Sequence, residues 1–271
     1  MSADYVLQTI DLRKDFKGFT AVEDVNLNIE RGTIHALIGP NGAGKTTVFN
    51  LLTKFLTPTT GKILYNGTDI TAMEPAAIAR MGVIRSFQIS AVFPHLSVLE
   101  NVRVSLQRTE GNSFHFWKSE KILDGLNDRA MELLESVGLQ EYADTVTVDL
   151  PYGRKRALEI ATTLALEPEL MLLDEPTQGM GHEDIDLVAD LIKKVSVGRT
   201  ILMVEHNLHV VSKLADKITV LQRGAILTEG DYQTVSADPR VREAYMGVSE
   251  DEEVIDSSDK AKAVAAEEAD V

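Results

Sequence analysis

Eight consecutive residues have the types and the spacing that bind a triphosphate. They are Gly39-Pro40-Asn41-Gly42-Ala43-Gly44-Lys45-Thr46, which match the phosphate-loop pattern G-x-x-x-x-G-K-[ST] at every fixed position. The glycines let backbone N–H groups close around phosphates, the lysine reaches the β- and γ-phosphates, and the threonine hydroxyl binds Mg²⁺. These residues, with Thr47 beside them, therefore predict a site for a nucleoside triphosphate and Mg²⁺.

Two adjacent carboxylates late in the chain complement this loop. The run Leu170-Met171-Leu172-Leu173-Asp174-Glu175 predicts a buried strand that ends in an acidic pair. A phosphate loop needs a carboxylate from another strand end to hold Mg²⁺, and we predict that Asp174 is this ligand. Glu175 follows directly, where it is predicted to polarise an attacking water. Without the phosphate loop upstream, such a pair would more simply predict a surface turn.

Strands and helices are predicted on both sides of the phosphate loop. The apolar residues 34–38 predict a buried strand that enters the loop, and residues 46–56 predict the helix that leaves it. Apolar residues alternate at 6–10 and at 25–29, which predicts antiparallel strands before the loop. A short strand at 62–66 is expected to end in a turn at Asn66-Gly67.

Capping signals predict two helix starts in the next part of the chain. Thr71-Ala72-Met73-Glu74 forms a capping box before Pro75 and predicts a helix that ends near Gly82. Ser97-Val98-Leu99-Glu100 is a second capping box. Residues 89–148 are predicted to be mainly helical, and we interpret them as a subdomain inserted into the nucleotide-binding core. Its row of aromatic residues, at 114–117, either packs within the subdomain or docks on a partner.

Beyond Tyr152 the sequence alternates between helical and strand patterns. Strands are predicted at 170–174 and 200–205. The helices between them are indicated by two apolar faces: Leu158, Ala161 and Leu164 in one, and Ile185, Val188, Ala189 and Ile192 in the other. Such alternation implies a parallel sheet covered by helices. We find no internal repeat, so a single nucleotide site is expected.

The composition restricts the function further. The 271 residues contain no cysteine, so disulfides, thiolate metal sites and cysteine nucleophiles are excluded. Neither a secretion signal nor an apolar run long enough to cross a membrane is present. Of the net charge of −15, residues 249–271 carry −7, which predicts a solvated, disordered tail or, as an alternative, a segment that contacts a partner. The acidic body argues against binding to nucleic acid.

From residue 16 to residue 230 the sequence resembles the ATPase subunit of an ATP-binding-cassette (ABC) transporter. Besides the loop and the acidic pair, the resemblance rests on Phe16, Gln88, the signature-loop segment Leu150-Pro151-Tyr152-Gly153-Arg154, the segment 178–181 and His206. It implies an α/β fold: a P-loop NTPase core of the ABC type with an antiparallel β subdomain and an inserted α-helical subdomain. ATP is then the implied nucleotide.

The resemblance also implies roles for these residues. Phe16 matches the aromatic residue that stacks on adenine, and Gln88 matches the glutamine that contacts the metal and the water between the subdomains. His206 matches the switch histidine that contacts the γ-phosphate during catalysis. Gly153 and Arg154 belong to the signature loop, which binds the ATP of an opposing subunit.

The signature loop departs from the family's Leu-Ser-Gly-Gly-Gln, because Pro151 replaces the serine and provides neither a hydroxyl nor an N–H. Gly181 also stands where the family often has aspartate. We therefore hypothesise that this subunit pairs with a different ATPase to give two unequal sites. Equal turnover by a purified homodimer, at the rate of the full complex, would exclude this hypothesis.

Within the superfamily the sequence is most similar to the branched-chain amino-acid uptake group. The similarity includes Phe87-Gln88-Ile89, the Tyr-Gly signature and the C-terminal Ala-Tyr-Met-Gly. It implies a second ATPase, two transmembrane permease subunits, an extracytoplasmic solute-binding protein and a peripheral location on the cytoplasmic face of the inner membrane. The alternatives are the ATPase of a lipopolysaccharide or lipid exporter and a soluble regulatory ABC ATPase.

These observations together predict four segments. Residues 1–88 form the first part of the ATPase core, 89–149 the helical subdomain and 150–248 the second part of the core. Residues 249–271 form the acidic tail.

Overall fold

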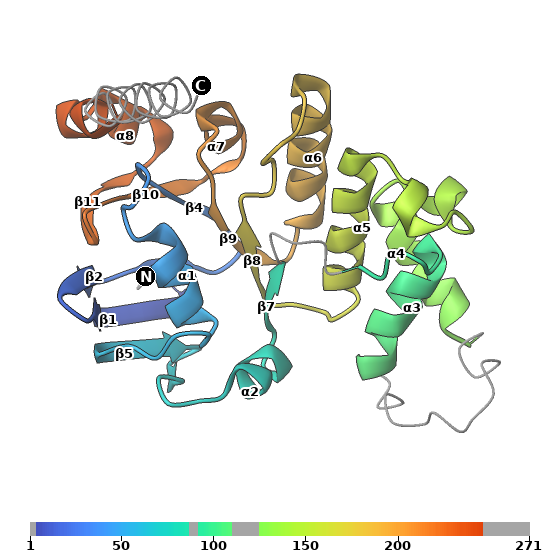
Figure 1. The fold of residues 1–271 in the computed structure, drawn as a ribbon, viewed down its shortest axis with the longest axis horizontal. Coiled ribbons are helices and arrows are strands. Elements are labelled where there is room, and N and C mark those ends of the chain that lie inside the picture. The colour runs from blue at the N-terminus through green and yellow to red at the C-terminus, as the bar shows by residue number, and fades with distance from the viewer. Residues whose placement is uncertain (1–3, 87–91, 110–124, 246–271) are drawn as a thin grey trace, which may run out of the picture.

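The computed structural model describes residues 4–86, 92–109 and 125–245 (Figure 1). Two sheets lie side by side, and the helices formed within residues 98–164 gather beyond one edge of the second sheet. The strands are β1 (Tyr5–Phe16), β2 (Phe19–Val25), β3 (Asn28–Glu30), β4 (Ile34–Ile38), β5 (Thr60–Tyr65), β6 (Thr68–Asp69), β7 (Val83–Ser86), β8 (Leu170–Asp174), β9 (Thr200–Val204), β10 (Lys217–Gln222) and β11 (Ala225–Gly230).

The helices follow the same alternation. They are α1 (Lys45–Leu52), α2 (Pro75–Arg80), α3 (Val98–Thr109), α4 (Asn127–Ser136), α5 (Tyr152–Leu164), α6 (His182–Val195), α7 (Leu208–Leu214) and α8 (Tyr232–Ala237), with short 3₁₀ turns η2 (Gln140–Tyr142) and η3 (Thr147–Asp149). Within the described residues, no helix is both long and apolar enough to span a membrane.

The second sheet has the order β11-β10-β4-β9-β8-β7, and its strands from β10 to β7 run parallel. The first sheet is antiparallel, with the order β2-β1-β5-β6 and with β3 paired to β1. An antiparallel sheet beside a helix-covered parallel sheet is the predicted α/β architecture. The prediction of the fold class is confirmed.

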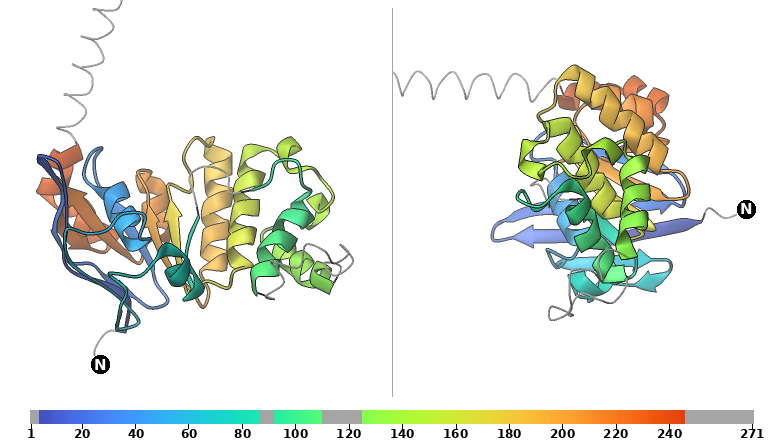
Figure 2. Two further views of the ribbon diagram at one scale, coloured as in Figure 1. Left: turned by 60° about the horizontal axis from the view of Figure 1, so that its bottom comes forward. Right: turned by 90° about the vertical axis from the view of Figure 1, so that its right-hand side faces the viewer.

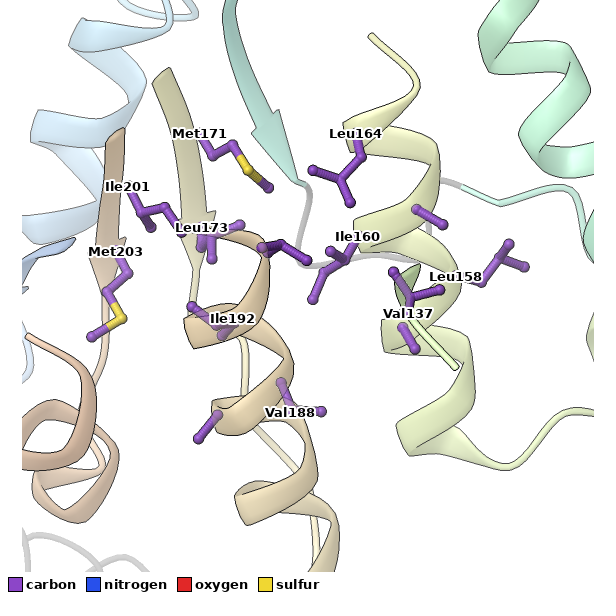
Figure 3. Close-up of a cluster of buried hydrophobic side chains, with 14 of the residues drawn as sticks. Val137, Leu158, Ile160, Leu164, Met171, Leu173, Val188, Ile192, Ile201 and Met203 are labelled. Carbon is purple, nitrogen blue, oxygen red and sulfur yellow. The ribbon is translucent and has the colours of Figure 1, made fainter. Parts of the chain in front are cut away.

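Two hydrophobic clusters cover opposite faces of the parallel sheet, because successive side chains of a strand point to opposite sides. Figure 3 shows one of them, where Met171 and Leu173 of β8 face Ile192 of α6 and Ile160 of α5. The other cluster contains Leu170 and the apolar face of α1. The helix faces predicted around 158–164 and 185–192 are buried as expected.

The helices α3, α4 and α5 pack together beyond the edge strand β7 (Figure 2). The second capping box is confirmed, because Ser97 N donates to Glu100 Oε2 at 2.7 Å and Glu100 N donates to Ser97 Oγ at 3.2 Å. The aromatic row at 114–117 and the acidic tail lie outside the described residues. The four predicted segment boundaries remain predictions.

The first capping box was a wrong prediction. The Thr71 hydroxyl accepts a hydrogen bond from Ile63 N at 2.9 Å and so fixes the strand β5 instead of a helix end. The helix α2 begins after Glu74, whose side chain makes no capping bond, with Pro75 in its first turn. Proline suits this position because its missing N–H would have no partner there.

The structure also differs from the predicted extents of one helix and two strands. The helix α1 stops at Leu52 instead of residue 56, since Lys54 has a left-handed backbone (φ 63°) that ends a helix. The strand expected over 25–29 is interrupted at 26–27, where the chain passes from β2 to β3. The strand β9 ends at Val204, one residue before Glu205.

A buried histidine gives this sheet a predicted pH dependence. His35 on β4 is fully buried, its Nε2 lies 2.7 Å from Thr219 Oγ1, and burial lowers its pKa to about 4. The unfolded chain therefore binds the proton at a pH where the native chain does not, and stability falls as the pH drops from 6.5 to 4. At ~1.4 kcal/mol per pKa unit, the loss approaches ~3 kcal/mol.

We expect chemical denaturation at pH 7 and at pH 4.5 to show this loss. His35→Gln retains a group that can bond to Thr219 but does not titrate, so its stability should fall less over the same interval. An equal fall in the variant and the natural chain would show that other groups cause the dependence.

Candidate nucleotide-binding site

Three neighbouring strands bring the predicted site residues to one edge of the parallel sheet. In the register, Leu37 of β4 pairs with Val204 of β9, and Val204 pairs with Asp174 of β8. Because the strands are parallel, the loops that follow them leave at the same edge (Figure 1). The phosphate loop, the acidic pair and His206, all close in sequence to these strand ends, therefore come together.

The backbone of the phosphate loop depends on glycine. Gly39, Gly42 and Gly44 have φ values of 150°, 75° and 101°, which other residues seldom adopt. Gly44 N-caps α1, and its carbonyl accepts the first bond of the helix from Val48 N at 2.9 Å. Ala43 N donates to Pro40 O at 3.2 Å, which closes the turn that contains Asn41. The α1 N-terminus thus points at the loop, where its partial positive charge favours an anion.

The lysine of the loop lies against its own backbone. Lys45 Nζ donates to Gly39 O at 2.6 Å and to Pro40 O at 3.0 Å, and the residue is 9% exposed. Burial lowers the pKa of Lys45, and the negative charge of Glu175 opposes this effect. Thr46 is exposed and Thr47 is half-buried at the start of α1. The first turn of α1 thus contains both an ammonium group and a hydroxyl.

Gly39 offers a direct test of this loop. A Cβ on Gly39 would lie 2.2 Å from Leu221 O, which is a backbone atom that cannot rotate away. We expect Gly39→Ala to displace the loop and to weaken ATP binding at least about tenfold, as ~1.4 kcal/mol of strain would produce. The control is Gly67→Ala, since Gly67 also has a positive φ (73°) but meets no atom within 4 Å. Titration with a fluorescent ATP analogue measures both; equal affinities would contradict the prediction.

The two carboxylates of the acidic pair have different surroundings. Asp174 is 2% exposed and its carboxylate forms an ion pair with Arg85 on β7. Glu175 has a left-handed backbone (φ 45°) and its N–H donates to Val204 O at 2.9 Å. The turn after β8 is therefore fixed to the neighbouring strand β9, and Glu175 is the residue at which the chain leaves the sheet.

The donors for a magnesium ion are oxygen atoms, which this metal prefers. Thr46 provides a hydroxyl after β4 and Asp174 a carboxylate at the end of β8, at the same sheet edge. Within the described ranges, no group of three or more His, Cys, Asp or Glu side chains could hold a metal by itself. The donor set thus fits an ion that takes its other ligands from phosphate oxygens and water.

The comparison with known proteins now decides the family. The sequence model of the ABC transporter family matches residues 22–178, which is more than half of the chain. The chain belongs to the ABC transporter family. A second model, described as a branched-chain amino acid ATP-binding cassette transporter, matches residues 225–251 of this ABC protein.

Relatives of known function extend over nearly the whole ABC chain. The high-affinity branched-chain amino acid transport ATP-binding protein LivG of Escherichia coli K12 is 37% identical over 254 residues, or 89% of this chain and 98% of LivG. The corresponding protein BraF of Pseudomonas aeruginosa is 36% identical over 252 residues, with the same coverage. The chain is an ATP-binding ATPase, as predicted from its motifs.

Solved structures of similar proteins have the same fold as this chain. The ADP conformation of MJ1267, an ATP-binding cassette of an ABC transporter, superimposes with a TM-score of 0.78 at 28% identity, over 90% of this chain and 99% of MJ1267. A nucleotide-free ATP-binding cassette from an ABC transporter gives 0.76 at 28% identity, over 89% of this chain and 98% of its own. The predicted ABC-type fold is confirmed at the level of the whole cassette.

The ABC signature segment begins the helix α5. Pro151 is its N-cap and makes no side-chain capping bond. A Cβ on Gly153 would lie 2.9 Å from Asp184 Oδ1, so an acidic group of α6 lies beside this helix start. The guanidinium of Arg154 stacks 4.1 Å from the ring centroid of Tyr142, a cation–π contact in the helical part of the chain. In this chain the arginine is therefore engaged by a neighbouring ring.

Three further residues were predicted for the ABC site from the sequence. Phe16 ends β1 and is 44% exposed, with Lys14 Nζ 5.3 Å from its ring centroid. His206 is exposed just after β9, and its N–H donates to Glu205 Oε2 at 3.0 Å. Gln88 lies outside the described residues, which end two positions earlier at Ser86.

Sequence reasoning missed two arginines that hold the acidic turn of the ABC site. Arg85 pairs with Asp174, as described above. Arg156 is buried on α5, where its Nη2 donates to Asp174 O at 3.1 Å, its Nε donates to Pro176 O at 3.2 Å, and Nη1 pairs with Glu159. The sequence does contain a signal for both residues, because each arginine interrupts an apolar segment that is predicted to be buried. A buried charge needs a partner.

Proposed function

We propose that this chain powers the uptake of branched-chain amino acids or a related small polar solute, as one of the two ATPases of an importer. The observation that carries the proposal is the second family match, over residues 225–251, because it concerns a segment outside the general ATPase match. LivG and BraF, the relatives described above, are named for branched-chain amino acid transport.

In the proposed site, residues of this chain hold the nucleotide from three sides. Phe16 offers an exposed ring to the adenine, and the N–H groups between Gly42 and Thr46 surround the phosphates. Lys45 Nζ turns from the carbonyl groups of Gly39 and Pro40 to the β- and γ-phosphates, which are stronger acceptors for its charge. Thr46 and Asp174 would hold Mg²⁺, with Gln88 as a further ligand.

The magnesium ion, when bound, neutralises charge that develops on the phosphate oxygens. Glu175 orients a water molecule and takes its proton, while the water oxygen bonds to the γ-phosphorus and the bond to the β,γ-bridging oxygen breaks. ADP and phosphate are the products. His206, at the neighbouring strand end, donates a hydrogen bond to a γ-phosphate oxygen, so both loops act on the same phosphoryl group.

A second, different ATPase would complete the site. Signature loops act on the nucleotide of the opposing subunit, and here Pro151 lacks the serine hydroxyl and Arg154 is stacked on Tyr142. We propose that this chain contributes a weaker signature side to its partner's ATP, while its own ATP is completed by the partner. The two sites of the pair would then turn over at unequal rates.

The proposed membrane partners are two permease subunits, with a solute-binding protein outside the membrane. A groove of about 280 Å³ supports this proposal, because residues of β7, α2 and α3 line it together. Its lining includes the exposed ring of Phe55, Ala79 of α2, Arg85 of β7 and Arg108 of α3. A permease helix in this groove would contact both the core and the helical part of the chain. Such docking would place this chain on the cytoplasmic face of the inner membrane.

Detergent co-purification from the native host, with mass spectrometry of the retained proteins, tests the proposal. We expect two permeases, a second ATPase and a solute-binding protein, whose solute can then be identified by screening amino acids. Retention of lipid-export components would instead favour an exporter. Recovery of no membrane protein would contradict a role in transport.

A further inference from the structure

One buried carboxylate beside the site has no role in the proposed chemistry. Glu205 directly follows β9 and is 0% exposed. Buried glutamates are rare, and those that persist are usually paired with a cation. Among the described residues, the donors to the Glu205 carboxylate are instead neutral: three backbone N–H groups and one hydroxyl.

The two carboxylate oxygens of Glu205 bind different loops. Oε1 accepts from Thr177 N at 3.0 Å and from Thr177 Oγ1 at 2.5 Å. Oε2 accepts from His206 N at 3.0 Å and from Asn207 N at 3.1 Å. One carboxylate therefore joins the loop that follows β8 to the loop that follows β9.

These loops carry the two residues on which the proposed hydrolysis depends. Thr177 lies two positions after Glu175, in the turn that Gln178 N closes by donating to Glu175 O at 3.1 Å. Thr177 is itself buried, at 4% exposure. On the other loop, Glu205 precedes His206 and fixes its backbone N–H. Asn207 then caps α7 by accepting from His209 N and Val210 N. One side chain thus contributes to the positions of both loops.

We infer that Glu205 is a positioning residue for ATP hydrolysis: its carboxylate sets the separation of Glu175 and His206. The inference rests on the proposed roles of those two residues. A side chain as long as that of glutamate is needed for the carboxylate to reach both loops. Both of its oxygens are acceptors, so it can accept all four hydrogen bonds. Glutamine at this position directs an NH₂ group toward backbone donors on one side and releases that loop.

Steady-state kinetics of the full-length chain, alone and in its complex, provide the test. We expect Glu205→Gln to lower kcat at least about tenfold and to change the KM for ATP less than about threefold, because the phosphate loop is untouched. Glu205→Asp, which keeps the charge but shortens the reach, should also lose activity. Thr177→Val, which keeps the backbone N–H, should lose less than either. The matched control is Glu229→Gln, since Glu229 bonds to Thr219 and Lys217, outside the site.

A double-mutant cycle separates positioning from simple destabilisation. In a His206→Ala background, measured by single turnover, Glu205→Gln should lower the remaining rate by less than about twofold, because the separation that Glu205 sets no longer affects the rate once the His206 side chain is absent. An equal tenfold loss in both backgrounds would overturn the inference, as would an unchanged kcat in Glu205→Gln. A natural chain without ATPase activity in its complex would instead contradict the proposed function itself.

Discussion

Glu175→Gln is expected to reduce ATP turnover by at least about a hundredfold, which is the usual contribution of a general base. The glutamine amide has the same size as the carboxylate but cannot take a proton from water. The backbone of the turn should be unchanged, because its φ of 45° and its bond to Val204 O involve main-chain atoms. Binding of ATP, which depends on the phosphate loop, should persist.

The variant should therefore accumulate with ATP bound. Retention of radiolabelled ATP measures this state. The size of the complex by chromatography measures it as well, because we propose that ATP binding closes a pair of ATPases and hydrolysis reopens it. The matched control is Glu183→Gln, an exposed carboxylate in the first turn of α6. Unchanged turnover in Glu175→Gln would show that another group accepts the proton.

Arg156→Met is expected to lower the free energy of unfolding by about 3–5 kcal/mol, the usual cost of breaking a buried ion pair. Arg156 and Glu159 are 8% and 6% exposed, so the substitution leaves the Glu159 carboxylate buried without its cationic partner. The carbonyl groups of Asp174 and Pro176 lose their guanidinium donors at the same time. Urea denaturation followed by circular dichroism measures the loss.

A double variant separates stability from activity at this position. Arg156→Met with Glu159→Leu replaces the ion pair by apolar groups, which is often nearly neutral for stability. We expect the double variant to regain most of the stability but to remain slow in ATP turnover. The carbonyl groups of Asp174 and Pro176, on either side of Glu175, still have no hydrogen bond from Arg156. Recovery of full turnover would show that Arg156 acts on folding alone.

Short-range patterns were sufficient to predict most of the fold. The apolar strands that became β4, β8 and β9, and the helix faces of α5 and α6, bury the residues that their periodicity predicted. The phosphate loop was predictable because its chemistry depends on consecutive residues. The capping box at Thr71 failed for a long-range reason: its hydroxyl bonds to Ile63, on a strand whose position in space the local sequence does not specify.

The supporting contacts of the site were beyond this kind of prediction. Arg85, Arg156 and Glu205 act through residues that are distant in sequence, such as Asp174 and Thr177. A buried charge in the sequence indicates that a partner exists, but it does not identify that partner. The parallel register of β4, β9 and β8 provides that information, because it determines which loops become neighbours.

The ion pair between Arg85 and Asp174 has a consequence for experiments with metals. The carboxylate that would bind Mg²⁺ already has a counter-ion from its own chain. With Mg²⁺ bound at Asp174 as proposed, the metal would compete with Arg85 for this carboxylate, and the guanidinium also donates to Asn50 Oδ1 at 2.7 Å. An apparent magnesium affinity measured on this protein would report the competition between an ion in solution and a tethered arginine. Two chains with identical metal ligands can therefore differ in magnesium affinity because of the residue that β7 places beside the carboxylate.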